Sequence, residues 1–251
     1  MLNQKKRYIM SDEQVKGVEM ESFTLGTTIC KFKLPLSIID DINTAYDKAK
    51  ENKNVAVPSG STKLFGSLRP HNDSLAGKIA DEFKVTDILS DDIKSVFNVY
   101  FRQYLHTIRK PWWHTNLQTA WINDMKANEY NPFHYHNSPT TDLGLSSVLM
   151  LKKPSTYGKE FSRADELTNG QLEFSGGQQD SLSMSQFKTD AEVGELYVFP
   201  YTLLHGVYPF NGTDEIRRTL SYNCNLYKPA VVKQVRDKQI KEADNVKNEN
   251  V

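Results

Sequence analysis

The sequence has few of the features that mark secreted or membrane-spanning proteins. Only two cysteines, Cys30 and Cys224, occur in 251 residues, too few and too far apart for a disulfide framework. We expect both to be reduced thiols that pack as small buried hydrophobes. No apolar run approaches the roughly 20 residues that cross a bilayer. No apolar stretch follows the basic residues Lys5 to Arg7, as a secretory signal requires. A cytoplasmic protein is therefore expected.

An excess of charge of either sign is also missing. The chain has 31 basic and 31 acidic side chains, which gives a formal net charge of zero. General nucleic-acid binding depends on clustered excess Lys and Arg, so it is not expected. The composition, 38% hydrophobic and 25% charged, is typical of a globular protein with a core.

The first 110 residues are predicted to be mainly helical. Apolar residues at helical spacing follow Ser37, the expected N-cap, until about Asn52. The segment Asp73–Phe83 carries apolar residues at four-residue intervals and predicts a second helix. The strongest pattern runs from Ile93 to Ile108 after Ser90, which is the expected cap. Its broad aromatic stripe needs an apolar partner, and a sheet face is the natural one.

After Pro111 the pattern changes to short strand-like runs separated by turn residues, as in an all-β sandwich or barrel. The eight runs are Thr119–Asp124, Phe133–Asn137, Ser146–Lys152, Gln171–Phe174, Ser183–Phe187, Glu195–Phe199, His205–Tyr208 and Arg217–Tyr227. Eight short strands suggest a double-sheet jelly roll. The predicted fold is α+β, with N-terminal helices packed on one sheet of the jelly roll.

The domain organisation is predicted to be simple. The sequence shows neither an internal repeat nor a linker rich in Pro, Gly or Ser, so we expect residues 1–251 to form a single domain. Within it, the helical part spans residues 1–110, the β-core residues 111–227 and a polar tail residues 228–251. Ten of the 24 tail residues are charged, which favours a frayed helix or disorder.

Three of the six histidines form a candidate metal site. His134 and His136 are two residues apart in a strand-like run, and side chains at that spacing project from the same face. A third imidazole from a distant strand, His205, would complete one face of an octahedron and leave the other positions open. The alternative interpretation is that the paired histidines are polar residues on a solvated sheet face.

The last strand has a polar face. Arg217, Thr219, Ser221 and Asn223 alternate with apolar residues, which fits a wet inner cavity better than a core. An arginine in such a cavity offers a fork that matches a carboxylate. The alternative is an exposed face on which Arg217 forms a surface ion pair.

These segments resemble a known family in their order and spacing. They are Asn131–His136, Ser146–Lys152, Gly194–Pro200 followed by His205, and Arg217-x-Thr219-x-Ser221-x-Asn223. Together they resemble the Fe(II)- and 2-oxoglutarate-dependent oxygenases, in the prolyl-hydroxylase-like branch found in bacteria and marine phages. The resemblance covers roughly residues 118–227, under half of the chain. If the chain is phage-encoded, the expected location is the host cytoplasm.

The resemblance implies a double-stranded β-helix that holds Fe(II) through His134, His136 and His205. The superfamily usually has a carboxylate at the middle position, where this chain has His136. Replacing that carboxylate with a neutral imidazole weakens the hold on the metal unless a neighbouring acceptor compensates. Asp142 is a candidate for that acceptor or for a substitute ligand.

The resemblance also implies a site for 2-oxoglutarate. Arg217 matches the position that pairs with the far carboxylate of the cosubstrate, and Arg218 would replace it if a bulge exchanged the two. Thr219 or Ser221 is expected to donate a hydroxyl hydrogen bond to the same carboxylate. Asn123, on the first strand of the core, is a further candidate contact.

The implied activity couples decarboxylation of 2-oxoglutarate by O2 to hydroxylation of a substrate C–H bond. A prolyl or other peptidyl side chain is the expected substrate, while a nucleobase or a free metabolite stays open. No membrane partner is expected. The long polar segment 153–170 is interpreted either as a loop that gates the site or as a surface insertion.

Two alternatives compete with the oxygenase hypothesis. A cupin-type protein would bind a metal through the three histidines without 2-oxoglutarate. However, its second motif expects a glycine where Thr202 stands, and it gives Arg217 no role. A non-enzymatic β-domain would carry incidental histidines and bind another protein.

Overall fold

The computed structural model describes residues 26–51, 78–161, 166–177 and 185–238. Its N-terminal elements are β1 (Cys30–Lys33), α2 (Leu36–Glu51), β2 (Lys78–Ile79), β3 (Asp81–Lys84) and α3 (Asp91–Thr107). The elements of the core are β4 (His114–Met125), β5 (Glu129–His134), β6 (Gly144–Lys152), β7 (Leu172–Ser175), β8 (Gln186–Thr189), β9 (Glu195–Pro200), β10 (Leu204–Val207) and β11 (Arg217–Tyr227). Residues 229–238 are helical, and the rest of the predicted tail lies outside the described residues.

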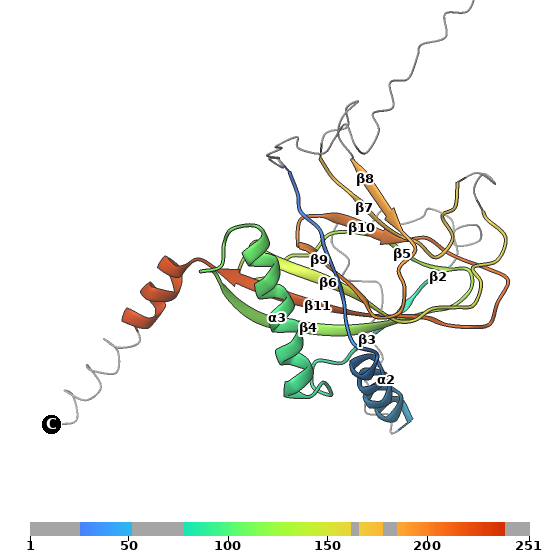
Figure 1. Cartoon of the computed structure of the whole chain (residues 1–251), viewed down its shortest axis with the longest axis horizontal. Helices are drawn as coiled ribbons and strands as arrows, with labels where there is room; N and C mark the ends of the chain where they lie inside the picture. Colours follow the sequence, from blue (N-terminus) through green and yellow to red (C-terminus); the bar gives the residue numbers. More distant parts are fainter. Residues whose placement is uncertain (1–25, 52–77, 162–165, 178–184, 239–251) are drawn as a thin grey trace, which may run out of the picture.

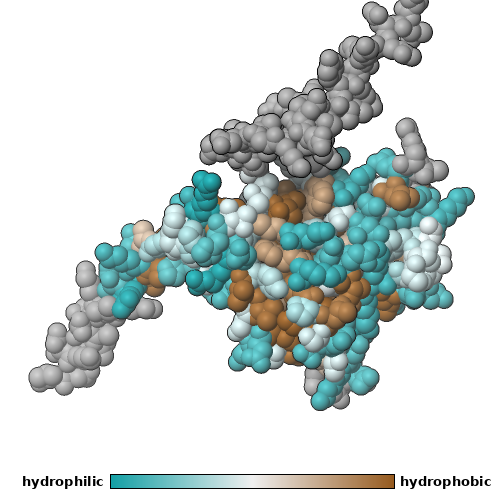
Figure 2. Space-filling view, in the orientation of Figure 1, coloured by the Kyte–Doolittle hydropathy of each residue, from teal (hydrophilic) through white to brown (hydrophobic). Residues whose placement is uncertain are grey.

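Two sheets form the body of the protein (Figure 1). A six-stranded sheet has the order β1-β9-β6-β11-β4-β3, and a five-stranded sheet has the order β2-β5-β10-β7-β8. Both helices cover the outer face of the six-stranded sheet. In Figure 2, apolar side chains gather between α3 and α2 on this side of the molecule.

Strand β6 shows how alternation divides the apolar residues between two layers. Leu145, Leu149 and Leu151 join the core beneath the helices, whereas Val148 and Met150 join a second core between the sheets. Side chains of successive strand residues point to opposite faces, so both faces of β6 are buried. The jelly roll predicted from the sequence is confirmed, and strands β4 to β11 are the eight expected ones.

The helical prediction for Asp73–Phe83 is wrong in the part that the structure describes. Residues 78–79 and 81–84 are strands, and residues 73–77 lie outside the described ranges. Strand β3 pairs with β4 so that Phe83 lies opposite Ile122. Its ring packs against Tyr46 of α2 at a centroid distance of 5.8 Å. Tertiary pairing at a sheet edge thus overrides a weak helical periodicity.

The two other predicted helices are present. Ser90 caps α3 as expected, because its hydroxyl oxygen accepts a hydrogen bond from the Ile93 backbone N–H at 3.3 Å. Ser37 is not the cap of α2, since that helix already begins at Leu36, directly after Pro35. Neither cysteine forms a disulfide, as expected. Among the described residues, no helix is long and apolar enough to cross a membrane.

A buried ion-pair network attaches α2 to the sheet. The Arg218 guanidinium on β11 donates to Asp124 on β4 at 2.6 and 3.1 Å, and to Asp47 on α2 at 2.8 Å. Lys50 of α2 also reaches Asp124, at 3.0 Å. Burial alone would raise the pKa of Asp124, but hydrogen bonds and charge from Arg218 and Lys50 lower it.

We predict that Asp124→Ala lowers the free energy of unfolding by about 3–5 kcal/mol, because it removes the buried partner of Arg218. Urea unfolding followed by circular dichroism at neutral pH measures the loss. The control is Lys31→Ala, which breaks an exposed ion pair with Glu195 and costs at most about 1 kcal/mol. Equal losses in the two variants would contradict the prediction.

Candidate active site

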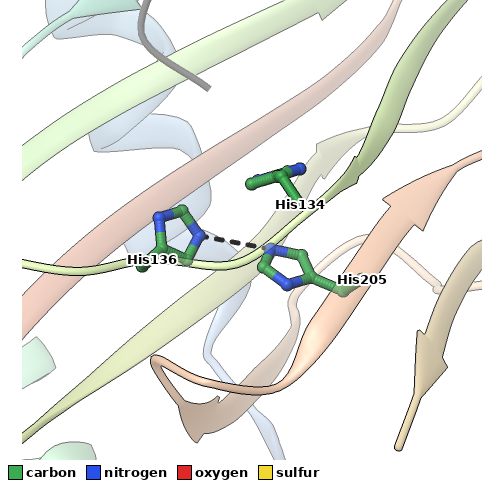
Figure 3. A group of neighbouring side chains, drawn as sticks. All are labelled: His134, His136 and His205. Atoms are coloured by element: carbon green, nitrogen blue, oxygen red, sulfur yellow. Dashed lines mark hydrogen bonds between the residues drawn. The ribbon is translucent and has the colours of Figure 1, made fainter. Parts of the chain in front are cut away.

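Antiparallel pairing of β5 with β10 brings two histidines together. His134 is the last residue of β5 and lies directly opposite His205 of β10. Their ring centroids are 4.3 Å apart, and both side chains are buried. Residues that face each other across an antiparallel pair hold their side chains on the same face. One nitrogen each from His134, His136 and His205 lies within 4.8 Å of the others (Figure 3).

His136 reaches the cluster from outside the strand. The expected strand Phe133–Asn137 is wrong at its end, because β5 stops at His134 and His136 lies in the following segment. There the His136 backbone N–H donates to the Tyr201 carbonyl at 2.8 Å. Its Nε2 lies 3.2 Å from Nε2 of His205. The position of His136 thus comes from an irregular segment hydrogen-bonded to Tyr201 and not from strand alternation.

Backbone carbonyls orient two of the three rings. Nδ1 of His134 lies 2.7 Å from the Pro132 carbonyl oxygen, and Nδ1 of His205 lies 2.9 Å from that of Leu203. With Nδ1–H donating to each carbonyl, Nε2 presents its lone pair to the cluster. Nε2 of His205 lies 3.2 Å from Nε2 of His136, a hydrogen-bonding distance that a cation bound by both nitrogens would replace.

Burial keeps these imidazoles neutral. Burial, together with the smaller effect of neighbouring His134, lowers the pKa of His136 to about 3. The pKa values of His134 and His205 are lowered by burial as well. A neutral imidazole is the form that binds a metal, so the site is prepared for a cation of the Fe(II) or Zn(II) type.

Arg217 lies on the opposite face of β11 from Arg218. It is 1% exposed, and its Nε donates to the Gly170 carbonyl at 2.9 Å. Its Nη2 is buried and has no hydrogen-bond partner among the described residues. Burial lowers the pKa of Arg217, and the nearby Tyr157 raises it. A buried guanidinium without a bound carboxylate is costly, so this environment fits an anionic ligand.

The inner face of the six-stranded sheet connects Arg217 to the histidines. On it, Thr219 pairs with Asn123 and Ser221 pairs with Trp121. The Trp121 ring lies 5.5 Å from that of His136. Thr219 is therefore the predicted hydroxyl nearer to Arg217, whereas Ser221 lies nearer to the histidines. Asn123 is buried, and its Oδ1 has no partner in the described ranges.

Two sequence candidates fall outside this arrangement. Asp142 is exposed and is not part of the histidine cluster, so the carbonyls of Pro132 and Leu203 occupy the acceptor role considered for it. Arg218 faces α2, because β11 keeps its alternation at this point despite a register shift against β6.

Sequence reasoning did not assign two aromatic residues to the site. Tyr157 belongs to the segment 153–170, and its buried hydroxyl has no partner among the described residues although Arg217 lies near. Its ring packs on Phe210 at 5.5 Å. Trp121 lies beside His136, as described above. The sequence signal that could have found Tyr157 is an aromatic residue within this long polar segment.

Comparisons with known proteins agree with this geometry. Residues 119–223 match the family model described as "Putative 2OG-Fe(II) oxygenase". Among solved structures, the α-ketoglutarate-dependent epimerase SnoN from nogalamycin biosynthesis is 12% identical with a TM-score of 0.52, covering 78% of each chain. A Pseudomonas putida prolyl-4-hydroxylase is 12% identical with a TM-score of 0.47, over 78% of this chain and 91% of its own. No curated protein matches at a significant level.

The resemblance to Fe(II)- and 2-oxoglutarate-dependent oxygenases is thereby confirmed for the β-core. The double-stranded β-helix is the shared fold, and Fe(II) and 2-oxoglutarate fit the chemistry of the three imidazoles and the buried guanidinium.

The carboxyl group of Glu82, on the inner face, should make the stability of the protein depend on pH. Glu82 of β3 pairs with Asn123, and burial raises its pKa to about 7. Between the ordinary pKa near 4.5 and pH 7 the folded chain therefore holds a proton that the unfolded chain releases. Stability falls as pH rises through this range.

We predict that Glu82→Gln, which cannot ionise, gains stability over the wild type as pH rises from 5 to 8. Urea unfolding of both proteins at these two pH values measures the difference. A difference that is equal at both pH values would contradict the raised pKa.

Proposed function

We propose that this protein is an Fe(II)- and 2-oxoglutarate-dependent hydroxylase that acts on a peptidyl substrate, with a prolyl side chain as the first candidate. The observation that carries the proposal is the guanidinium of Arg217, which is buried, forms no salt bridge among the described residues and lies on the face that leads to three clustered histidines. The match of residues 119–223 to the oxygenase family supports it.

His134, His136 and His205 are proposed to hold the iron. The carbonyls of Pro132 and Leu203 keep two of the rings oriented and their Nε2 atoms deprotonated. When bound, Fe(II) and 2-oxoglutarate supply the oxidation chemistry in which O2 converts the cosubstrate to succinate and CO2 and hydroxylates a C–H bond.

Arg217 is proposed to bind the far carboxylate of 2-oxoglutarate. The free Nη2 and the Tyr157 hydroxyl are hydrogen-bond donors without partners in the described ranges, and Thr219 adds a hydroxyl two residues along β11. Charge-assisted hydrogen bonds from a fixed guanidinium fork orient the cosubstrate relative to the histidines. The cupin alternative leaves this buried charge without a role.

Aromatic rings exclude water around the histidines. Phe199 and Phe174 lie against His205 at centroid distances of 4.5 and 6.1 Å. Trp121 and Tyr201 lie beside His136 at 5.5 and 6.2 Å. In this surrounding, charges interact more strongly than in water, and reactive oxygen chemistry is kept from solvent.

We predict that the wild-type protein, given Fe(II), ascorbate and 2-oxoglutarate, forms succinate slowly even without a substrate. His205→Ala should abolish succinate formation and lower Fe(II) content, because it removes a ligand from the cluster. His106→Ala, on the exposed side of α3, is the control, and it should retain both succinate formation and Fe(II) content. Metal binding without binding of 2-oxoglutarate would instead favour the cupin alternative.

A second prediction separates the charge of Arg217 from its packing. Arg217→Met removes a buried charge that forms no salt bridge among the described residues, so the variant without cosubstrate should be at least as stable as the wild type. Its affinity for 2-oxoglutarate should fall about 10–100-fold, the equivalent of one or two lost charge-assisted hydrogen bonds.

Thermal unfolding with and without 2-oxoglutarate measures both effects, since a ligand that binds only the folded state raises the unfolding temperature. Arg236→Met, an exposed substitution in the C-terminal helical segment, is the control. An unchanged response to 2-oxoglutarate in Arg217→Met would remove the anchoring role.

A further inference from the structure

We propose that Ser146 and Asn223 form a subsite that binds an amide group of the substrate. The proposal rests on the function proposed above and adds to it the part of the site that recognises the substrate. Neither residue has a role in holding the metal or the far carboxylate of the cosubstrate.

Ser146 and Asn223 are neighbours on the inner face of the six-stranded sheet. Ser146 of β6 lies directly opposite Asn223 of β11. The residues on either side, Leu145 of β6 and Tyr222 of β11 among them, belong to the core beneath the helices. Alternation therefore turns both polar side chains away from the helices and toward the five-stranded sheet.

This pair lies beside the histidines. Across the next strand pair, Ser146 lies opposite Phe199 of β9, whose ring is 4.5 Å from that of His205. Along β11, Asn223 is two residues from Ser221, which pairs with Trp121, and the Trp121 ring is 5.5 Å from that of His136. Two aromatic rings that contact the cluster thus flank the pair.

Both side chains have unused hydrogen-bonding capacity. Ser146 is 0% exposed, and neither its Oγ nor the buried Oδ1 of Asn223 has a partner among the described residues. Asn225, the next inward-facing residue of β11, differs because its side chain is fully hydrogen-bonded. Its side chain accepts from the Tyr201 hydroxyl and donates to Ser138 and Thr140.

Leaving buried polar groups unpaired destabilises a fold, so such groups are retained where a ligand pairs with them. The two groups are complementary to the N–H donor and the C=O acceptor of an amide. The Asn223 carbonyl oxygen accepts an N–H, and the Ser146 hydroxyl donates to a C=O. An ester of the same shape lacks the N–H and satisfies only one of them.

The proposed anchor of the cosubstrate, Arg217, lies on the same face but far from Asn223. Arg217 and Asn223 are six residues apart on one strand, which is about 20 Å at the usual rise of a strand. That distance exceeds the length of a five-carbon dicarboxylate. A cosubstrate whose far carboxylate binds Arg217 therefore does not extend along β11 as far as Asn223, and we assign Ser146 and Asn223 to another molecule.

The test uses the full chain loaded with Mn(II) and N-oxalylglycine, an unreactive analogue of 2-oxoglutarate. The probes are N-methylacetamide and methyl acetate, which share a shape but differ in the N–H group. Paramagnetic relaxation of the methyl protons of each probe reports how much of it binds near the metal. We expect N-methylacetamide to be relaxed more strongly than methyl acetate.

Ser146→Ala and Asn223→Ala are each expected to weaken N-methylacetamide binding about 3–10-fold, the equivalent of one lost hydrogen bond. Affinity for N-oxalylglycine should stay unchanged in both. Ser37→Ala, exposed on α2, is the matched serine control, and it should change neither N-methylacetamide binding nor N-oxalylglycine affinity.

Two results would overturn the subsite. One is equal relaxation of the two probes by the wild type. The other is a loss of N-oxalylglycine affinity in the Ser146 or Asn223 variants, which would assign these residues to the cosubstrate. Failure of the wild type to bind Mn(II) and N-oxalylglycine at all is a different outcome, and it would refute the proposed function itself.

Discussion

The pairing of His134 with His205 across β5 and β10 is the contact on which the site depends. It fixes two imidazoles at a centroid separation of 4.3 Å through backbone hydrogen bonds that lie inside a closed sandwich. The third imidazole follows, because the chain that leaves β5 is held to the Tyr201 carbonyl. No long flexible side chain sets this geometry, so the cluster is already assembled before a ligand arrives.

The guanidinium of Arg217 gives the interior near the cluster a positive charge, and no carboxylate of the described residues forms a salt bridge with it. The histidines are neutral, Arg217 is cationic, and Asp142 stays at the surface. A divalent cation adds to this imbalance, whereas a dicarboxylate ligand offsets it. Binding of metal and cosubstrate should therefore be mutually favourable, since each lowers the electrostatic cost of the other. A three-histidine site gains from its cosubstrate the charge that a carboxylate ligand would otherwise supply.

The sequence predicted the features that depend on strand alternation. The eight core strands and the inward face of β11 follow from a period of two. The three histidines do come together as predicted, but His136 reaches the cluster from outside β5 and not by strand alternation. Strands β1 to β3 were missed because edge strands are short and their pairing partners are distant in sequence. Tyr157 was not assigned to the site, because a loop residue that approaches Arg217 carries no periodic signal. The roles of the individual site residues stay predictions.

Arg217 and Arg218 are adjacent residues that point to opposite faces of one strand. A slip of β11 by a single position would move one guanidinium into the place of the other and leave the second place without an arginine. In one direction the cavity would lose its guanidinium, and in the other Asp124 and Asp47 would lose theirs. The native register is therefore the one that supplies both the ligand pocket and the contact with α2.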